Sequence, residues 1–92
     1  MPLDMSVAET ITAKLTAAFE PERLEVVDES HKHEGHSGWR AGGETHFHVT
    51  VISKAFSGQS RIERQQAVYA ALSDELAGPV HALQVTARAP GE

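Results

Sequence analysis

A chain of 92 residues is long enough for one domain with a modest hydrophobic core, and too short for a large buried active site. Its formal net charge of −5 argues against a general nucleic-acid binder, because such proteins usually present a net-basic face. The sequence holds neither an apolar run near the roughly 20 residues that cross a bilayer nor a signal-peptide pattern. Since it also lacks the cysteines of a disulfide scaffold, we expect a single-domain cytoplasmic protein without a membrane partner.

The first predicted element is a helix that begins after Ser6. Ser6 and Glu9 have the spacing of a capping box. Apolar residues then recur at steps of four, as one buried helix face requires: Val7, Ile11, Leu15 and Phe19. Pro21 ends this helix, because proline pushes the residue before it out of the α region. The β-branched residues over positions 24–28 predict a short strand.

Residues 46–52 show the alternation of a half-buried strand. Its apolar face consists of Phe47, Val49 and Val51, and its other face of His46, His48 and Thr50. We expect His46 to form a hydrogen bond within the sheet rather than to bind metal.

A second capping box, formed by Ser60 and Glu63, follows a connection over residues 54–60 and begins a second helix. The predicted buried face of this helix consists of Ile62, Val68, Tyr69, Leu72 and Leu76. Gly78 suits a left-handed position just after the helix, and Pro79 prevents continuation. Residues 80–87 predict a third strand. This order favours an α+β fold, with helices on one face of a three-stranded sheet.

Residues 30–43 form a long His/Gly-rich loop without apolar periodicity. It contains four of the seven glycines together with His31, His33, His36 and Trp39. Loops of about 12–15 residues without secondary structure are usually functional or disordered, and both interpretations stay open here. The histidines and the tryptophan favour a functional loop.

Histidine is the side chain that most directly indicates chemistry in this sequence. Five of the six histidines lie between residues 31 and 48, and the sixth is His81. Imidazole is a common metal ligand and titrates near neutral pH, so a metal or cluster site and a pH-sensitive surface are both possible. Iron–sulfur clusters normally need thiolates, so if this cysteine-free chain binds such a cluster, another molecule must supply the thiolates. No nucleophile–base signature or Walker-type loop is present, and we expect a protein that is not an enzyme.

Several motifs together resemble the BolA family over residues 7 to 88. They are Asp28-Glu29-Ser30, His33, Glu44-Thr45-His46-Phe47, Val49, Val51, Ser53, Phe56-Ser57-Gly58, Arg64, Val68-Tyr69, Leu72, Glu75-Leu76 and Val80-His81-Ala82-Leu83. The resemblance implies a single BolA-like domain over residues 1–92, with an α+β fold of α-β-β-α-(α)-β order related to the class II KH domain.

The resemblance also implies a function. BolA-like proteins pair with a monothiol glutaredoxin and share a [2Fe–2S] cluster with it, in cluster trafficking or in iron and redox regulation. The glutaredoxin and a glutathione supply the thiolates, and the metal ligands of the BolA-like chain match His33 in the loop and His81 at the last strand. His31 and His36 are possible accessory metal ligands. The simpler alternatives are a structural role for His81 and no metal role for His33.

A nucleic-acid-binding transcriptional regulator that uses the KH-like surface is the second hypothesis. Gly58 precedes a predicted helix N-terminus, where backbone N–H groups could receive a phosphate, and Lys54, Arg61 and Arg64 would supply positive charge. The segment lacks the two glycines of a KH Gly-x-x-Gly loop, so we expect only weak DNA binding. A capped helix with solvated arginines is the simpler interpretation. A third possibility is an interaction module without a cluster, whose histidines only make association depend on pH.

Overall fold

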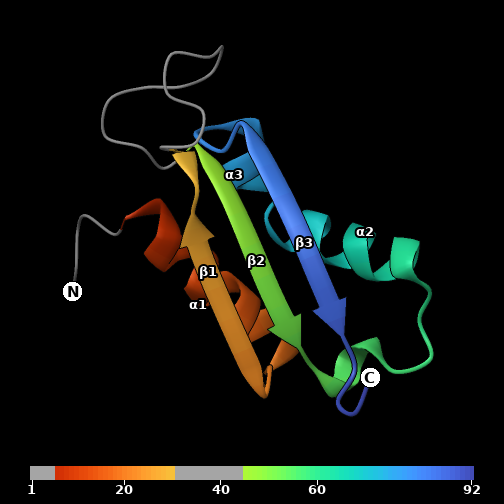
Figure 1. Ribbon diagram of the computed structural model, residues 1–92. Coiled ribbons are helices and arrows are strands. Elements are labelled where there is room, and N and C mark those ends of the chain that lie inside the picture. Colours follow the sequence, from red (N-terminus) through yellow and green to blue (C-terminus); the bar gives the residue numbers. More distant parts are fainter. Residues whose placement is uncertain (1–5, 31–44) are drawn as a thin grey trace.

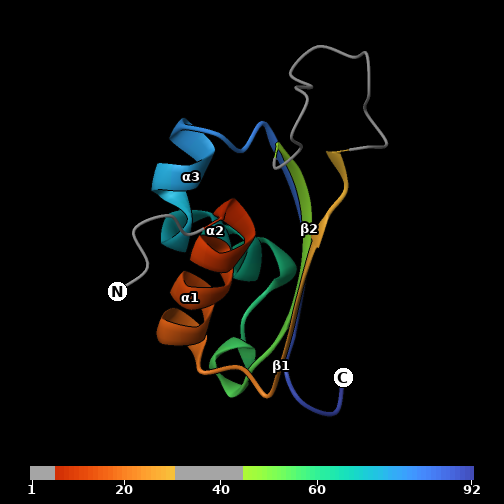
Figure 2. The ribbon, with the colours of Figure 1, turned by 90° about the vertical axis from the view of Figure 1, so that its left-hand side faces the viewer.

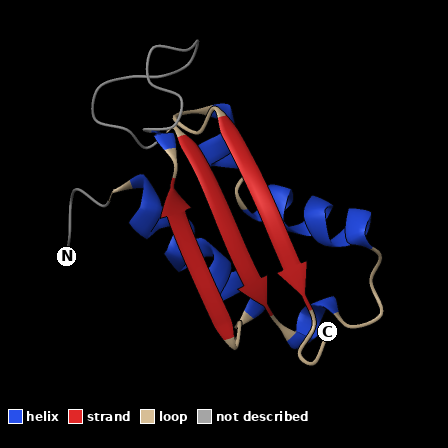
Figure 3. Cartoon of the chain, viewed as in Figure 1, coloured by secondary structure: helices blue, strands red, loops and turns tan. Residues whose placement is uncertain are grey.

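Three strands and three helices make up the computed structural model, which describes residues 6–30 and 45–92. In chain order the elements are α1 (Val7–Phe19), β1 (Arg23–Asp28), β2 (His46–Ile52), the 3-10 turn η2 (Lys54–Phe56), α2 (Arg61–Ala71), α3 (Ser73–Ala77) and β3 (Ala82–Arg88). The predicted α+β class and element order are confirmed (Figure 3).

The sheet has the order β1-β2-β3, with β1 antiparallel and β3 parallel to β2. All the helices lie against one face of this sheet, and the other face is left uncovered by them (Figure 2). Because β1 runs opposite to its two neighbours, its end and the starts of β2 and β3 meet at one edge of the sheet (Figure 1). This topology decides which histidines can meet.

The core lies between the sheet and the helices. The predicted alternation in β2 is confirmed, since Phe47, Val49 and Val51 are all buried. The helical side contributes five fully buried side chains to this core. They are Ile11 and Leu15 of α1, Phe56 of η2, Val68 of α2, and Leu72, which directly follows α2. Both predicted capping boxes are also present, with reciprocal hydrogen bonds at Ser6 and Ser60. Within the described ranges, no helix is long and apolar enough to cross a membrane.

Ile62 was predicted on the buried face of the second helix, and this prediction is wrong, because its side chain is 69% exposed. It lies six residues before the buried Val68, which turns it by about 120° around the helix axis from that residue. Tyr69 and Leu76 are half-buried, and only Val68 and Leu72 of the predicted face are fully buried.

The end of the second helix also differs from the prediction. The single expected helix divides into α2 and α3 at Leu72, whose φ of −110° and ψ of 22° leave the helical range. Gly78 is not left-handed, since its φ is −115°. The N–H groups of Gly78 and Val80 both donate to the Glu75 carbonyl, so this turn is closed without a left-handed residue.

Candidate functional site

The sheet edge where β1 ends and β2 begins is tied together by main-chain and side-chain hydrogen bonds. The Glu29 N–H donates to the His46 carbonyl over 2.7 Å. The Ser30 N–H donates to the Asp28 carboxylate over 2.9 Å, and the Ser30 hydroxyl donates to the same oxygen. Ser30 is buried, so the chain is held in place on the side of β1 from which residues 31–44 continue.

Two histidines meet at this edge, His46 at the start of β2 and His81 just before β3. The ring centroids of His46 and His81 are 5.5 Å apart, with the ring planes inclined by 54°. His46 is buried, and its Nδ1 lies 2.8 Å from the Thr45 hydroxyl oxygen. The predicted hydrogen bond of His46 is thus present, although its partner is the side chain of the preceding residue rather than a group within the sheet. His81, in contrast, is exposed just before β3.

The His81 main chain is fixed although its side chain is exposed. The N–H groups of His81 and Ala82 donate to the same Thr45 carbonyl, over 2.7 and 3.2 Å. The strand β3 begins at Ala82, two residues later than predicted. The exposed imidazole therefore extends from a fixed main chain.

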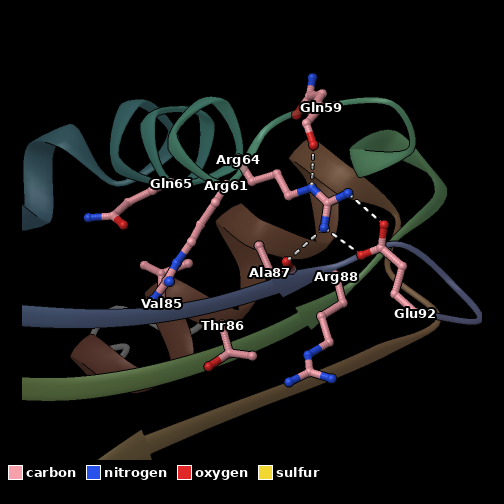
Figure 4. Close-up of a pocket in the computed structure, with 9 residues that line it drawn as sticks. All are labelled: Gln59, Arg61, Arg64, Gln65, Val85, Thr86, Ala87, Arg88 and Glu92. Atoms are coloured by element: carbon pink, nitrogen blue, oxygen red, sulfur yellow. Dashed lines mark hydrogen bonds and ion pairs between the residues drawn. The ribbon is translucent and has the colours of Figure 1, made fainter.

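A second feature is an open groove of about 560 Å³ between the start of α2 and the end of β3 (Figure 4). Its lining residues are Gln59, Arg61, Arg64, Gln65, Val85, Thr86, Ala87, Arg88 and Glu92. The guanidinium of Arg64 binds both carboxylate oxygens of Glu92, over 2.5 and 2.7 Å. It also donates to the carbonyls of Gln59 and Ala87. All three guanidinium nitrogens of Arg64 therefore donate hydrogen bonds within the protein (Figure 4).

Both the fold and the sequence now bear on the family. The sequence pattern of the family described as BolA-like protein matches residues 15–92, which is most of the chain. The chain belongs to the BolA-like family. The resemblance seen in the paired motifs around His46 and His81 is thereby confirmed.

Individual relatives agree with this assignment. The BolA-like chain is 48% identical over 86 residues to BolA-like protein 1 of Mus musculus, covering 94% of this chain and 60% of the mouse protein. It is 44% identical over 79 residues to the DNA-binding transcriptional regulator BolA of Escherichia coli (strain K12), covering 86% of this chain and 71% of that protein. The solved structure of BolA1 from Arabidopsis thaliana matches with a TM-score of 0.85 at 32% identity, covering 97% and 98% of the two chains.

Of the predicted metal ligands in this BolA-like chain, the structure places only His81. His31, His33 and His36 lie outside the described residues. In the part of the chain that the structure describes, no three His, Asp or Glu side chains are close enough together to hold a metal ion. Among the described residues, His81 is therefore the predicted metal ligand whose position is known, and the ligand roles of the loop histidines stay predictions.

The predicted nucleic-acid residues do not form one cluster. Arg61 and Arg64 both line the groove, whereas Lys54 and the left-handed Gly58 do not. The Arg64 side chain is only 12% exposed and is already paired with the Glu92 carboxylate, whereas Arg61 is exposed. Sequence reasoning missed Arg88, which brings a further positive charge to the groove from the end of β3. No local pattern marks it, because only the fold places β3 beside the start of α2.

The contact between Glu92 and Arg64 predicts a pH-dependent contribution to stability. The hydrogen bond from Arg64, with a further one from the Ala89 N–H, lowers the pKa of Glu92 from 4.5 to about 2. A carboxyl group whose pKa is lower in the folded state than in the unfolded state stabilises the fold at pH values above the unfolded-state pKa. This stabilisation is lost as the pH falls through the folded-state pKa. We expect wild type to exceed Glu92→Gln in urea stability at neutral pH, with the difference shrinking below pH 4.5 and largely lost by about pH 2. An equal difference at both ends of this range would show that the ion pair adds no stability.

Proposed function

We propose that this BolA-like protein is a non-enzymatic, cytoplasmic partner of a monothiol glutaredoxin and shares a [2Fe–2S] cluster with it, in iron–sulfur cluster trafficking or in iron and redox regulation. The observation that supports this most is the exposed His81 imidazole on a fixed main chain at the sheet edge. Residues 31–44 are joined to the same edge, between Ser30 and Thr45.

The donor set of the chain suits a shared cluster. Without cysteine the chain offers imidazole only, and the thiolates come from the glutaredoxin and a glutathione in this proposal. When bound, a [2Fe–2S] cluster with imidazole in place of thiolate has a raised reduction potential. The part of His81 is to present a neutral ring nitrogen, and the part of Thr45 is to hold the main chain that carries it.

Co-expression with the monothiol glutaredoxin of the same host tests the proposal. We expect a 1:1 complex, purified without oxygen, whose visible absorption and circular dichroism spectra differ from those of the glutaredoxin homodimer. A mixture whose spectrum is only the sum of the separate proteins contradicts a shared cluster.

The loop histidines should differ in their effect on this complex. Family register selects His33, so we expect His33→Ala to change the cluster spectrum and speed cluster loss, while the heterodimer without cluster still forms. His31→Ala and His36→Ala should leave the cluster close to wild type, because neither is in the ligand register. Cluster absorbance followed over time in the three variants makes the comparison. Equal damage from His36→Ala and His33→Ala would show that the register is wrong or that the loop uses its histidines jointly.

The alternative function is DNA binding, which the name of the Escherichia coli relative brings to this chain. The exposed Arg61 at the start of α2 favours it, and the occupied guanidinium of Arg64 opposes it. With three exposed cations, Lys54, Arg61 and Arg88, we expect a slope of about −3 in log affinity against log salt, since each neutralised phosphate adds about −0.9. A labelled duplex titrated at several salt concentrations measures this. Tight, sequence-dependent binding at physiological salt that Arg61→Ala removes would reverse the ranking of the two functions.

A further inference from the structure

His46 is a buried imidazole that the proposed ligand set does not use. It is 6% exposed, and its ring centroid lies 5.5 Å from that of His81, with the planes inclined by 54°. Tilted ring pairs at this separation attract each other, and the buried member restricts how the exposed member can rotate. The buried His46 ring therefore limits the space into which the His81 ring can turn.

Thr45 holds both histidines at once. Its hydroxyl oxygen lies 2.8 Å from the His46 Nδ1, and Thr45 itself is only 2% exposed. Its carbonyl accepts the N–H groups of His81 and Ala82. Thus the Thr45 carbonyl fixes the His81 main chain, while the Thr45 hydroxyl fixes the ring against which the His81 side chain packs.

We propose that Thr45 and His46 are positioning residues that hold the His81 imidazole in the rotamer in which it binds the shared cluster. This inference rests on the proposed function and deepens it. His46 acts through His81, because its own ring is buried and its Nδ1 already shares a hydrogen bond with Thr45. Metal-binding histidines commonly depend on such outer contacts for their orientation. A ring that is already oriented also loses less rotational freedom when it binds.

His48 provides a matched control on the same strand. It lies two residues after His46, on the same face of β2, and its Nε2 is 3.0 Å from the Thr86 hydroxyl oxygen. Both positions are thus histidines on one strand, and each contacts a threonine hydroxyl, that of Thr45 for His46 and that of Thr86 for His48. Of these two histidines, it is His46 whose ring lies beside the ring of His81.

The first test uses the isolated protein, so that it does not depend on the cluster. Nuclear magnetic resonance on histidine-labelled protein measures the His81 χ1 couplings and the ring-to-ring contacts with position 46. We expect one His81 rotamer in wild type and in His48→Leu, and rotamer averaging in His46→Leu. His46→Phe keeps a ring at this position and should restore the single rotamer. Thr45→Val replaces the hydroxyl that contacts His46 with a methyl group. If His46→Leu does not fold, this variant repeats the test, with rotamer averaging of His81 as the expected result.

The second test follows cluster lifetime in the co-purified heterodimer. We expect His46→Leu to shorten it about tenfold, the lower end of the range for lost outer contacts, and His46→Phe and His48→Leu to stay near wild type. A single His81 rotamer together with a wild-type lifetime in His46→Leu would overturn the inference, as would equal effects of His48→Leu. If the wild-type heterodimer holds no cluster, the proposed function fails, and the rotamer measurement alone still decides whether His46 orders His81.

Discussion

His81→Ala is expected to abolish or strongly destabilise the shared [2Fe–2S] cluster without unfolding the protein. The imidazole is exposed, so its removal leaves no cavity in the core. The hydrogen bond to the Thr45 carbonyl comes from the main-chain N–H and survives the substitution. Because hydrogen bonds hold the main chain at this position, we expect it not to shift so as to bring another side chain into the place of the ring. Cluster content per heterodimer, measured by absorbance after anaerobic purification, gives the result, and thermal unfolding of the isolated variant checks the fold.

The matched control for this prediction is His48→Ala. His48 lies on β2, two residues after His46, and its Nε2 is within hydrogen-bond distance of the Thr86 hydroxyl oxygen. Its removal should leave the cluster in place, because it does not lie at the edge where β1 ends and β3 begins. If His81→Ala keeps a wild-type cluster and lifetime, the imidazole is not a ligand, and the proposed function loses its main support.

The features that the sequence predicted well depend on interactions between near neighbours. The alternation of Phe47, Val49 and Val51 follows from the period of two in a strand that is buried on one face. The two capping boxes join residues only three positions apart, such as Ser6 and Glu9. For such features, the physical cause lies within the segment itself.

The features that the sequence did not predict depend on contacts between distant segments. The Arg64 guanidinium is bound by Glu92, 28 residues further along the chain. The rings of His46 and His81 meet only because β2 and β3 are parallel neighbours that start at the same edge. No periodicity in the sequence shows such a pairing. The exposed Ile62 is a related case, since its apolar character suggested burial and only the orientation of α2 placed it outside.

For the candidate site, sequence reasoning selected His81 through the family motif, and its ligand role stays a prediction; the hydrogen bond expected for His46 is present, with Thr45 as its partner. It could not show that Thr45 joins the two, because the carbonyl contact depends on where β3 begins. The ligand role of His33 stays a prediction from the family register. The histidine pair at the sheet edge is thus a result of topology, while the choice of residue types is visible in the sequence.

The second large effect is expected from Phe47→Ala, which tests whether the sheet edge depends on the core beneath it. Phe47 is 2% exposed on the central strand, where its Cα pairs with Asp28 of β1 and Leu83 of β3. Truncating a buried phenylalanine costs about 3–5 kcal/mol, a large share of the roughly 5–15 kcal/mol by which such domains are stable. Urea unfolding followed by circular dichroism measures the loss, and Thr50→Ala on the opposite face of β2 should cost less than about 1 kcal/mol. Because Phe47 directly follows His46, we also expect Phe47→Ala to release the His81 ring, whereas Phe47→Leu should keep it ordered. A loss no larger than that of Thr50→Ala would show that the core does not hold β2, and with it Thr45 and His46, in place.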